Sequence, residues 1–309
     1  MHCSATNYKS SKPAALPGRP RWLSMLFLPV LAGLAMLGMT PWGAAPVKAQ
    51  APSPSAPGVK LYIFDLGSLH SANPEPLLKR GVTVTDMSVV AYLVVHPRGT
   101  LLWDSGTIPD ELVKPGGTTV ARATVTKTLS GQLAEIGYKP ADINYLALSH
   151  YHYDHSANAN QFAGATWLVQ RPERAAMFPE KPPANPIDPN VSDKFSALAK
   201  SKTVLLDGDH DVFGDGSVVI LSTPGHTPGH QALLVRLPKT GAVLLSGDAV
   251  HFKANWDNRR VPAMNVSKEQ TLASMQRMAD ILAKEHGELW INHDKPQSDA
   301  QKKAPDYYE

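Results

Sequence analysis

Short apolar runs recur along the chain from residue 61 onward, and they predict a protein built around strands. Most runs are about four to eight residues long and end at Gly, Pro, Asp or His, which is typical of buried strands bounded by turns. The predicted strands are Leu61–Leu66, Val89–Val95, Thr100–Trp103, Tyr145–Leu148, Thr166–Val169, Thr203–Leu206, Val218–Leu221, Ala232–Leu237, Val243–Leu245 and Leu289–Ile291.

Two segments between these runs have a helical pattern. Thr124–Ile136 predicts one helix, and Ser267–Glu285 predicts a longer one that Gly287 closes. Ser267 and Gln270 have the spacing of a capping box, which marks the start of a helix. Strands that alternate with helices indicate an α/β protein, and we expect a single domain over residues 58–309. The long helix has an apolar stripe whose methionines should pack in the core: Leu272, Met275, Ala279 and Leu282.

The first 50 residues differ in kind from the rest. Basic residues precede an apolar run from Trp22 to Met39, and Val47-Lys48-Ala49 offers small residues at the −3 and −1 positions of a cleavage site. This pattern predicts a secretory signal peptide over residues 1–49, the alternative being a membrane anchor. We therefore expect a periplasmic or secreted protein that meets the membrane only during export. A flexible, proline-rich leader is expected over residues 50–57.

Removal of the signal peptide would change the charge and the cysteine content. Five of the 30 basic residues and none of the 27 acidic ones lie in residues 1–49, which leaves 25 bases, 27 acids and a net charge of −2. This balance argues against a nucleic-acid partner. The single cysteine, Cys3, also lies in this segment, so neither a disulfide framework nor a thiolate metal site is expected.

Four potential metal donors crowd into one heptapeptide, Ser149-His150-Tyr151-His152-Tyr153-Asp154-His155. It follows a predicted strand directly, so it forms a loop at a strand end, where the sites of α/β proteins assemble. Imidazole and carboxylate groups suit Zn²⁺ and similar divalent ions. In an extended segment His150 and His152 point the same way, and the following turn brings Asp154 and His155 to a second point. One ion rarely uses all four donors, so the motif favours two ions.

Three more donors follow later in the chain, each near the end of a predicted strand. His226 lies in the segment Thr223–His230, where glycines and prolines make a rigid turn. Asp248 and His293 each come shortly after an apolar run. The repeated order of strand, small or polar residue and donor predicts that one edge of a sheet collects these side chains around two divalent metal ions, with zinc as the default.

The motif His150-x-His152-x-Asp154-His155, followed in order by His226, Asp248 and His293, resembles the metallo-β-lactamase superfamily over residues 58–309. The resemblance implies a single-domain αββα sandwich with a dinuclear metal site at one sheet edge. It also implies a division of the donors. One metal would take His150, His152 and His226, the other would take Asp154, His155 and His293, and Asp248 would bridge both.

Two further residues are expected close to the metals without being ligands. Asp104 stands where the family places an aspartate that orients a histidine ligand, although an aspartate before Gly106 is also typical of a plain turn. His230 is interpreted as a packing or orienting residue.

Within the superfamily, the segment Thr223–Gln231 and the tail around His293 resemble the N-acyl homoserine lactonases. This implies a small-molecule substrate, with N-acyl homoserine lactones first. Those lactonases carry a tyrosine three residues after the bridging aspartate, whereas this chain has His251 there. We expect the His251 imidazole to contact the substrate in place of the tyrosine.

The predicted chemistry is hydrolysis. Two metal ions can share a hydroxide at neutral pH, and this hydroxide attacks a carbonyl carbon while the metals stabilise the negative oxygen. Asp154, and after it Asp248, is the candidate for carrying a proton to the leaving group; either could instead serve as a ligand alone. The alternatives are the same metal centre acting on thioesters, phosphotriesters, β-lactams or halogenated aromatics, and a metal-binding module without turnover.

Two segments are candidates for lining the substrate pocket. Trp256, Arg259 and Arg260 follow Asp248 closely, and an arginine there could bind a carboxylate or phosphate; the alternative is a salt-bridged surface pair. Phe178–Lys200 is rich in Pro, Asn, Asp and Lys, which indicates either a lid or binding insert or a surface loop. The sequence leaves an oligomer possible.

Overall fold

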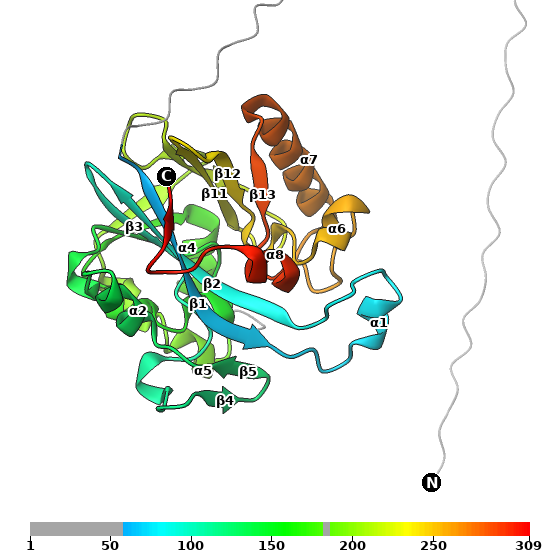
Figure 1. Ribbon diagram of the computed structural model, residues 1–309, viewed down its shortest axis with the longest axis horizontal. Coiled ribbons are helices and arrows are strands. Elements are labelled where there is room, and N and C mark those ends of the chain that lie inside the picture. Colours follow the sequence, from blue (N-terminus) through cyan, green and yellow to red (C-terminus); the bar gives the residue numbers. More distant parts are fainter. Residues whose placement is uncertain (1–57, 182–185) are drawn as a thin grey trace, which may run out of the picture. The chain divides into compact units, whose positions relative to one another are not determined.

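The computed structural model describes residues 58–181 and 186–309 (Figure 1). The predicted signal peptide and leader lie outside the described residues and stay predictions. None of the helices in the described part of the chain combines the length and the apolar character needed to cross a membrane.

Two sheets form the centre of the fold. The first has nine strands in the order β4-β5-β1-β2-β3-β6-β7-β8, with β14 paired to β1: Thr118–Val120, Ala123–Val125, Lys60–Leu69, Met87–His96, Gly99–Trp103, Tyr145–Ala147, Thr166–Gln170, Thr203–Leu206 and, for β14, Tyr307–Tyr308. The second has five strands in the order β13-β12-β11-β10-β9: Glu288–Trp290, Gly241–Leu245, Gln231–Leu237, Val218–Ser222 and His210–Asp211.

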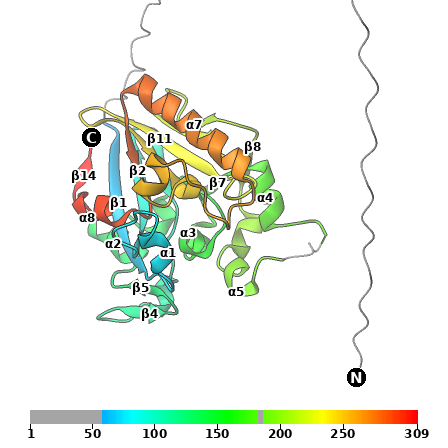
Figure 2. The ribbon, with the colours of Figure 1, turned by 90° about the vertical axis from the view of Figure 1, so that its right-hand side faces the viewer.

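Helices cover the outer face of each sheet (Figures 1 and 2). Leu129 of α2 and Met177 of α4 pack on the outer face of the first sheet, and Met278 of α7 packs on the outer face of the second. The α-helices of the described residues are α1 to α8: Glu75–Leu78, Leu129–Glu135, Tyr153–Ser156, Arg171–Met177, Pro189–Ser192, Lys253–Asp257, Lys268–Glu285 and Lys295–Ala300.

The core has one layer between the two sheets and one on each outer side. In β1, Leu61 and Ile63 face the layer between the sheets, whereas Tyr62 and Phe64 face the helices on the other side. Successive side chains of a strand point to opposite faces, so a strand that is buried on both faces reads as a continuous apolar run. This explains why the apolar runs predict the strands, and the layers confirm the αββα sandwich.

The first predicted helix is wrong at its start. Ala123–Val125 forms β5, and α2 begins only after Thr128, whose hydroxyl accepts the backbone N–H of Gly131 at 3.0 Å. The β-branched residues before Thr128 favour a strand, and the hydroxyl cap supplies the stronger start signal.

The second predicted helix is confirmed, with corrections to its end and its buried face. Ser267 caps α7 by accepting the N–H of Gln270 at 3.2 Å. The helix ends at His286 rather than at Gly287, because His286 itself adopts the left-handed conformation with φ +51°. Met275 lies in the core as predicted, but Leu272 and Leu282 are only half-buried; the buried face consists of Thr271, Ser274, Met275 and Met278.

Candidate metal centre

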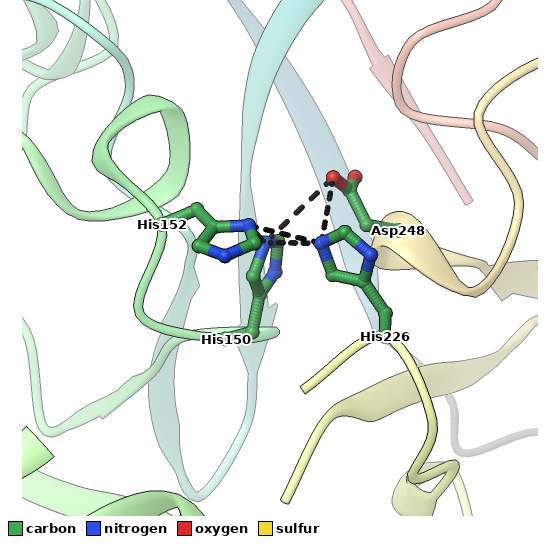
Figure 3. A group of neighbouring side chains, drawn as sticks. All are labelled: His150, His152, His226 and Asp248. Atoms are coloured by element: carbon green, nitrogen blue, oxygen red, sulfur yellow. Dashed lines mark hydrogen bonds and ion pairs between the residues drawn. The ribbon is translucent and has the colours of Figure 1, made fainter. Parts of the chain in front are cut away.

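The seven predicted metal donors meet at one edge of the sandwich. They come from the loop after β6, the turn between β10 and β11, and the segments after β12 and β13. They form two groups, and the ligand atoms within each group lie within 4.8 Å of one another. Figure 3 shows the first group. The first group is His150, His152, His226 and Asp248, and the second is Asp154, His155, Asp248 and His293.

In the first group, three ring nitrogens face one another. Nε2 of His226 lies 3.1 Å from Nε2 of His150 and 2.9 Å from Nδ1 of His152, and these last two atoms are 2.9 Å apart. A neutral imidazole has a single N–H, so three ring nitrogens at these distances cannot all be satisfied by hydrogen bonds among themselves. A carboxylate oxygen of Asp248 completes the group at 3.4 Å from His226. The converging lone pairs fit a cation.

In the second group, hydrogen bonds at Nδ1 of His293 and of His155 orient the two rings so that their Nε2 atoms point at carboxylates. Nδ1 of His293 lies 2.8 Å from the carbonyl oxygen of Ser88, which can only accept, so this nitrogen carries the hydrogen. The Nε2 atoms of His293 and His155 then point at Oδ1 of Asp248, at 3.1 and 3.2 Å. Nε2 of His155 and Oδ1 of Asp248 are buried without a hydrogen-bond partner among the described residues. A divalent cation would satisfy both atoms.

In the absence of metal, burial and the carboxylates of Asp154 and Asp248 set the charge of the centre. Burial lowers the pKa of His226 to about 2, which keeps this ring neutral. Burial also acts to lower the pKa of His293, but Asp248 and Asp154 outweigh it and raise this pKa to about 10. Burial acts to raise the pKa of Asp154, but His155 and His293 outweigh it and lower this pKa to about 2. Protons thus occupy the metal-free centre, and a metal has to displace them.

Asp104 and His230 lie beside the two groups rather than within them. Asp104 Oδ1 accepts the N–H of Ser149 at 2.6 Å, and its Oδ2 lies 2.9 Å from Nδ1 of His155. Asp104 therefore orients the His155 ring. His230 Nε2 accepts the N–H of Asp248 at 2.9 Å, and burial lowers the pKa of His230 to about 3. This contact fixes the backbone that presents the Asp248 carboxylate.

Sequence reasoning missed Glu173, a buried residue of α4 that holds two donor loops together. Its Oε1 accepts the N–H of Tyr151 at 2.9 Å, and its Oε2 accepts the hydroxyl of Thr227 at 2.8 Å and the N–H of Gly229 at 2.9 Å. Burial raises the pKa of Glu173 to about 7, although these hydrogen bonds act to lower it. No motif marks this residue, because only the packing of α4 against the turn brings it there.

A cavity of about 380 Å³ opens onto the donors. His251 lies in its wall, with Nε2 at 3.2 Å from Oδ2 of Asp248 and with a buried Nδ1 that lacks a partner among the described residues. Much of the remaining wall is apolar: Leu69, Leu77, Val82, Met87, Phe252, Pro262 and Met264. The cavity therefore suits a molecule with a reactive polar group and an apolar portion.

A family model described as the Metallo-beta-lactamase superfamily matches residues 84–284. The chain belongs to this superfamily. An N-acyl homoserine lactonase of Bacillus sp is 32% identical over 260 residues, which are 80% of this chain and 98% of that protein. The N-acyl homoserine lactonase AttM of Azorhizobium caulinodans is 29% identical over 260 residues, 81% of this chain and 99% of that protein.

Solved structures of the superfamily agree with this assignment. A crystal structure of a quorum-quenching N-acyl homoserine lactone lactonase is 27% identical to the chain, with a TM-score of 0.65 over 80% of this chain and 97% of that one. An N-acyl homoserine lactone hydrolase with the product N-hexanoyl-L-homoserine at its catalytic metal centre is also 27% identical, with a TM-score of 0.63 over 80% and 98%. The chain is a metal-dependent hydrolase of this lactonase-like kind.

Two predictions about the pocket of this superfamily member need correction. Arg260 lines the cavity, but Arg259 donates to the side chain of Gln276 and Trp256 packs against the core beside α7. Among the described residues both arginines donate to uncharged oxygens, so the salt-bridged pair is wrong as well. The described residues of Phe178–Lys200 line no part of the cavity. Phe195 and Leu198 are buried in the core beside the first sheet, and Phe178 packs against them. The other described residues of this segment are exposed or half-buried, as the alternative of a surface loop predicts.

Proposed function

We propose that this protein is an exported hydrolase that opens the lactone ring of N-acyl homoserine lactones, with two divalent metal ions, zinc by default, and with hydroxide as the nucleophile. The observation that carries the proposal is the pair of donor groups that share Asp248 at the cavity. The lactonases to which the chain is similar support the choice of substrate. The division of ligands between the two metals is proposed to be the one that the resemblance implies.

The metals and the chain contribute differently to this reaction. When bound, the two ions would lower the pKa of water and polarise the carbonyl group that is attacked. Asp154 belongs to the second donor group and also lines the cavity, so we assign it the transfer of a proton to the leaving oxygen. We assign His251 a hydrogen bond to the lactone, and its position in the cavity wall beside Asp248 supports this role. The apolar wall would hold the acyl chain and exclude water.

The proposed compartment is supported by the sequence of the N-terminal segment. A basic stretch, an apolar run and small residues before Gln50 favour export to the periplasm or beyond. Cell fractionation followed by N-terminal sequencing tests this part: the proposal expects a mature protein outside the cytoplasm that begins at Gln50. A cytoplasmic protein that keeps residues 1–49 would contradict it.

Turnover is tested with the zinc-loaded full chain by following proton release from a short-chain and a long-chain N-acyl homoserine lactone. We expect a kcat/KM on the order of 10⁴ M⁻¹s⁻¹ or more. His152→Ala removes a donor of the first group, so it should lower the metal content and abolish turnover. A protein that holds two metals but leaves both lactones intact would refute the substrate, and a panel of thioesters, phosphotriesters and β-lactams would then identify the bond. Inertness to the whole panel would favour the metal-binding module.

A further inference from the structure

Three arginines from three separate segments line the cavity: Arg80 after α1, Arg122 in the turn between β4 and β5, and Arg260 after α6. Figure 1 places α1 and α6 on the same side of the molecule. Arg260 donates to the carbonyl oxygen of Arg80, which joins two of the segments, and Tyr153, the neighbour of Asp154, lines the same cavity as Arg122. We call these three side chains the arginine rim.

The arginine rim has no acidic partner within 4.0 Å in the part of the chain that the structure describes. The acids of the surrounding segments are paired with other bases: Glu75 with Lys79 at 2.6 Å, Asp86 with His70 at 3.2 Å, and Asp257 with Lys253 at 2.6 Å. The acids in the cavity wall, Asp154 and Asp248, belong to the donor groups. The three guanidinium groups are exposed and form no ion pair with the described residues, so a ligand in the cavity can reach them.

The backbone beside the rim is unusual as well. Ala121 has φ +52° and Arg259 has φ +51°, and each immediately precedes a rim arginine. A residue with a Cβ adopts this left-handed conformation only at a cost in free energy. The conformation therefore persists only where the surrounding structure imposes it. Among the described residues only Asp104 and His286 share this feature, and Asp104 supports the metal centre. Two tight turns thus present Arg122 and Arg260 at the cavity.

A neutral N-acyl homoserine lactone offers no charge to these arginines. A guanidinium group can donate two parallel hydrogen bonds to the two oxygens of a carboxylate. Because no acid of the described chain pairs with the rim arginines, their guanidinium groups can bind the carboxylate of a ligand. We propose that the arginine rim binds a carboxylate group on the substrate. In such a substrate an apolar portion separates this carboxylate from the part that contains the bond to be cleaved. The proposal rests on the proposed function in one respect, namely that hydrolysis takes place at the donor groups.

Kinetics with a matched pair of lactones test the proposal. The pair is N-hexanoyl-L-homoserine lactone and its N-adipoyl analogue, in which a carboxylate replaces the terminal methyl group. We expect kcat/KM of the zinc-loaded full chain to be about tenfold higher for the N-adipoyl lactone, with a contribution of about twofold from each arginine. The ratio should fall to about one in R80Q/R122Q/R260Q and decrease at high salt. R259Q is the matched control and should keep the ratio.

Turnover of the neutral lactone with no preference for its N-adipoyl analogue would overturn the arginine rim while the proposed function stands. If neither lactone is cleaved, calorimetry decides the matter without turnover. The probes are hexanamide and adipamate, which differ by one carboxylate. We expect adipamate to bind about tenfold more tightly, and this advantage to vanish in R80Q/R122Q/R260Q at equal metal content. An advantage that survives in the variant would show that the metals bind the carboxylate, and would overturn the proposal.

Discussion

Removal of the Glu173 carboxylate should weaken both the fold and the metal centre. Glu173 is 2% exposed and accepts hydrogen bonds from Tyr151, Thr227 and Gly229, which lie in the two loops that carry His150, His152 and His226. In Glu173→Ala these donors lose their acceptor inside the protein. The Thr227 hydroxyl can rotate toward another acceptor, but the two backbone N–H groups cannot.

The magnitude follows from these contacts. A buried donor that is left without a partner costs about 1–3 kcal/mol, so the two N–H groups together cost about 2–6 kcal/mol. This is a large share of the total stability of a typical domain, about 5–15 kcal/mol. Glu173→Gln keeps one oxygen acceptor and loses the other, so it should cost roughly half as much. Because both loops carry donors of the first group, we also expect metal affinity to fall by about 10–100-fold.

Urea unfolding and metal titration of the same variants measure the two effects. Glu180→Ala is the matched control, since Glu180 is an exposed glutamate close by in the chain, and it should change stability by less than about 0.5 kcal/mol. The reasoning fails if Glu173→Ala unfolds like the wild type and binds metal equally well. A loss of stability with unchanged metal affinity would show that Glu173 supports the fold but does not position the loops.

Three further predictions concern single histidines. Without metal, the pKa of His293 is about 10 against 6.5 for a free imidazole, so its proton stabilises the folded chain below pH 6.5 and this stability is lost as the pH rises toward 10. Urea unfolding of the chelated protein at both ends of this range checks it, and a flat profile would contradict it. His251→Phe should lower kcat/KM for lactones about tenfold and His251→Tyr should restore it, whereas equal rates in both variants would remove His251 from the substrate contacts. His286→Gly should raise stability by about 0.5–1 kcal/mol in the same unfolding assay, and His286→Ala, which keeps a Cβ at φ +51°, should not.

The sequence by itself determined the main layers of this protein. Its apolar runs predict ten strands that the structure contains, since strands buried on both faces, such as β1, read as continuous apolar segments. Ser267 marks the start of α7, because a hydroxyl cap is a local signal. The seven donors were also visible in the sequence, since each follows an apolar run or lies in a glycine-rich turn. These features depend on neighbours along the chain.

Tertiary structure decided what depends on residues far apart in the chain. Thr124 joins a strand because β1 offers an edge to pair with, and Phe178 and Phe195 turn to the core rather than to the cavity because their rings pack there. Glu173 carries no motif, and only the approach of α4 to the Thr227 turn makes it a partner of both donor loops. The arginine rim likewise exists only where three distant segments meet at one cavity. Local pattern encodes strands, caps and donors, whereas the partners of a buried charge and the walls of a cavity arise from packing.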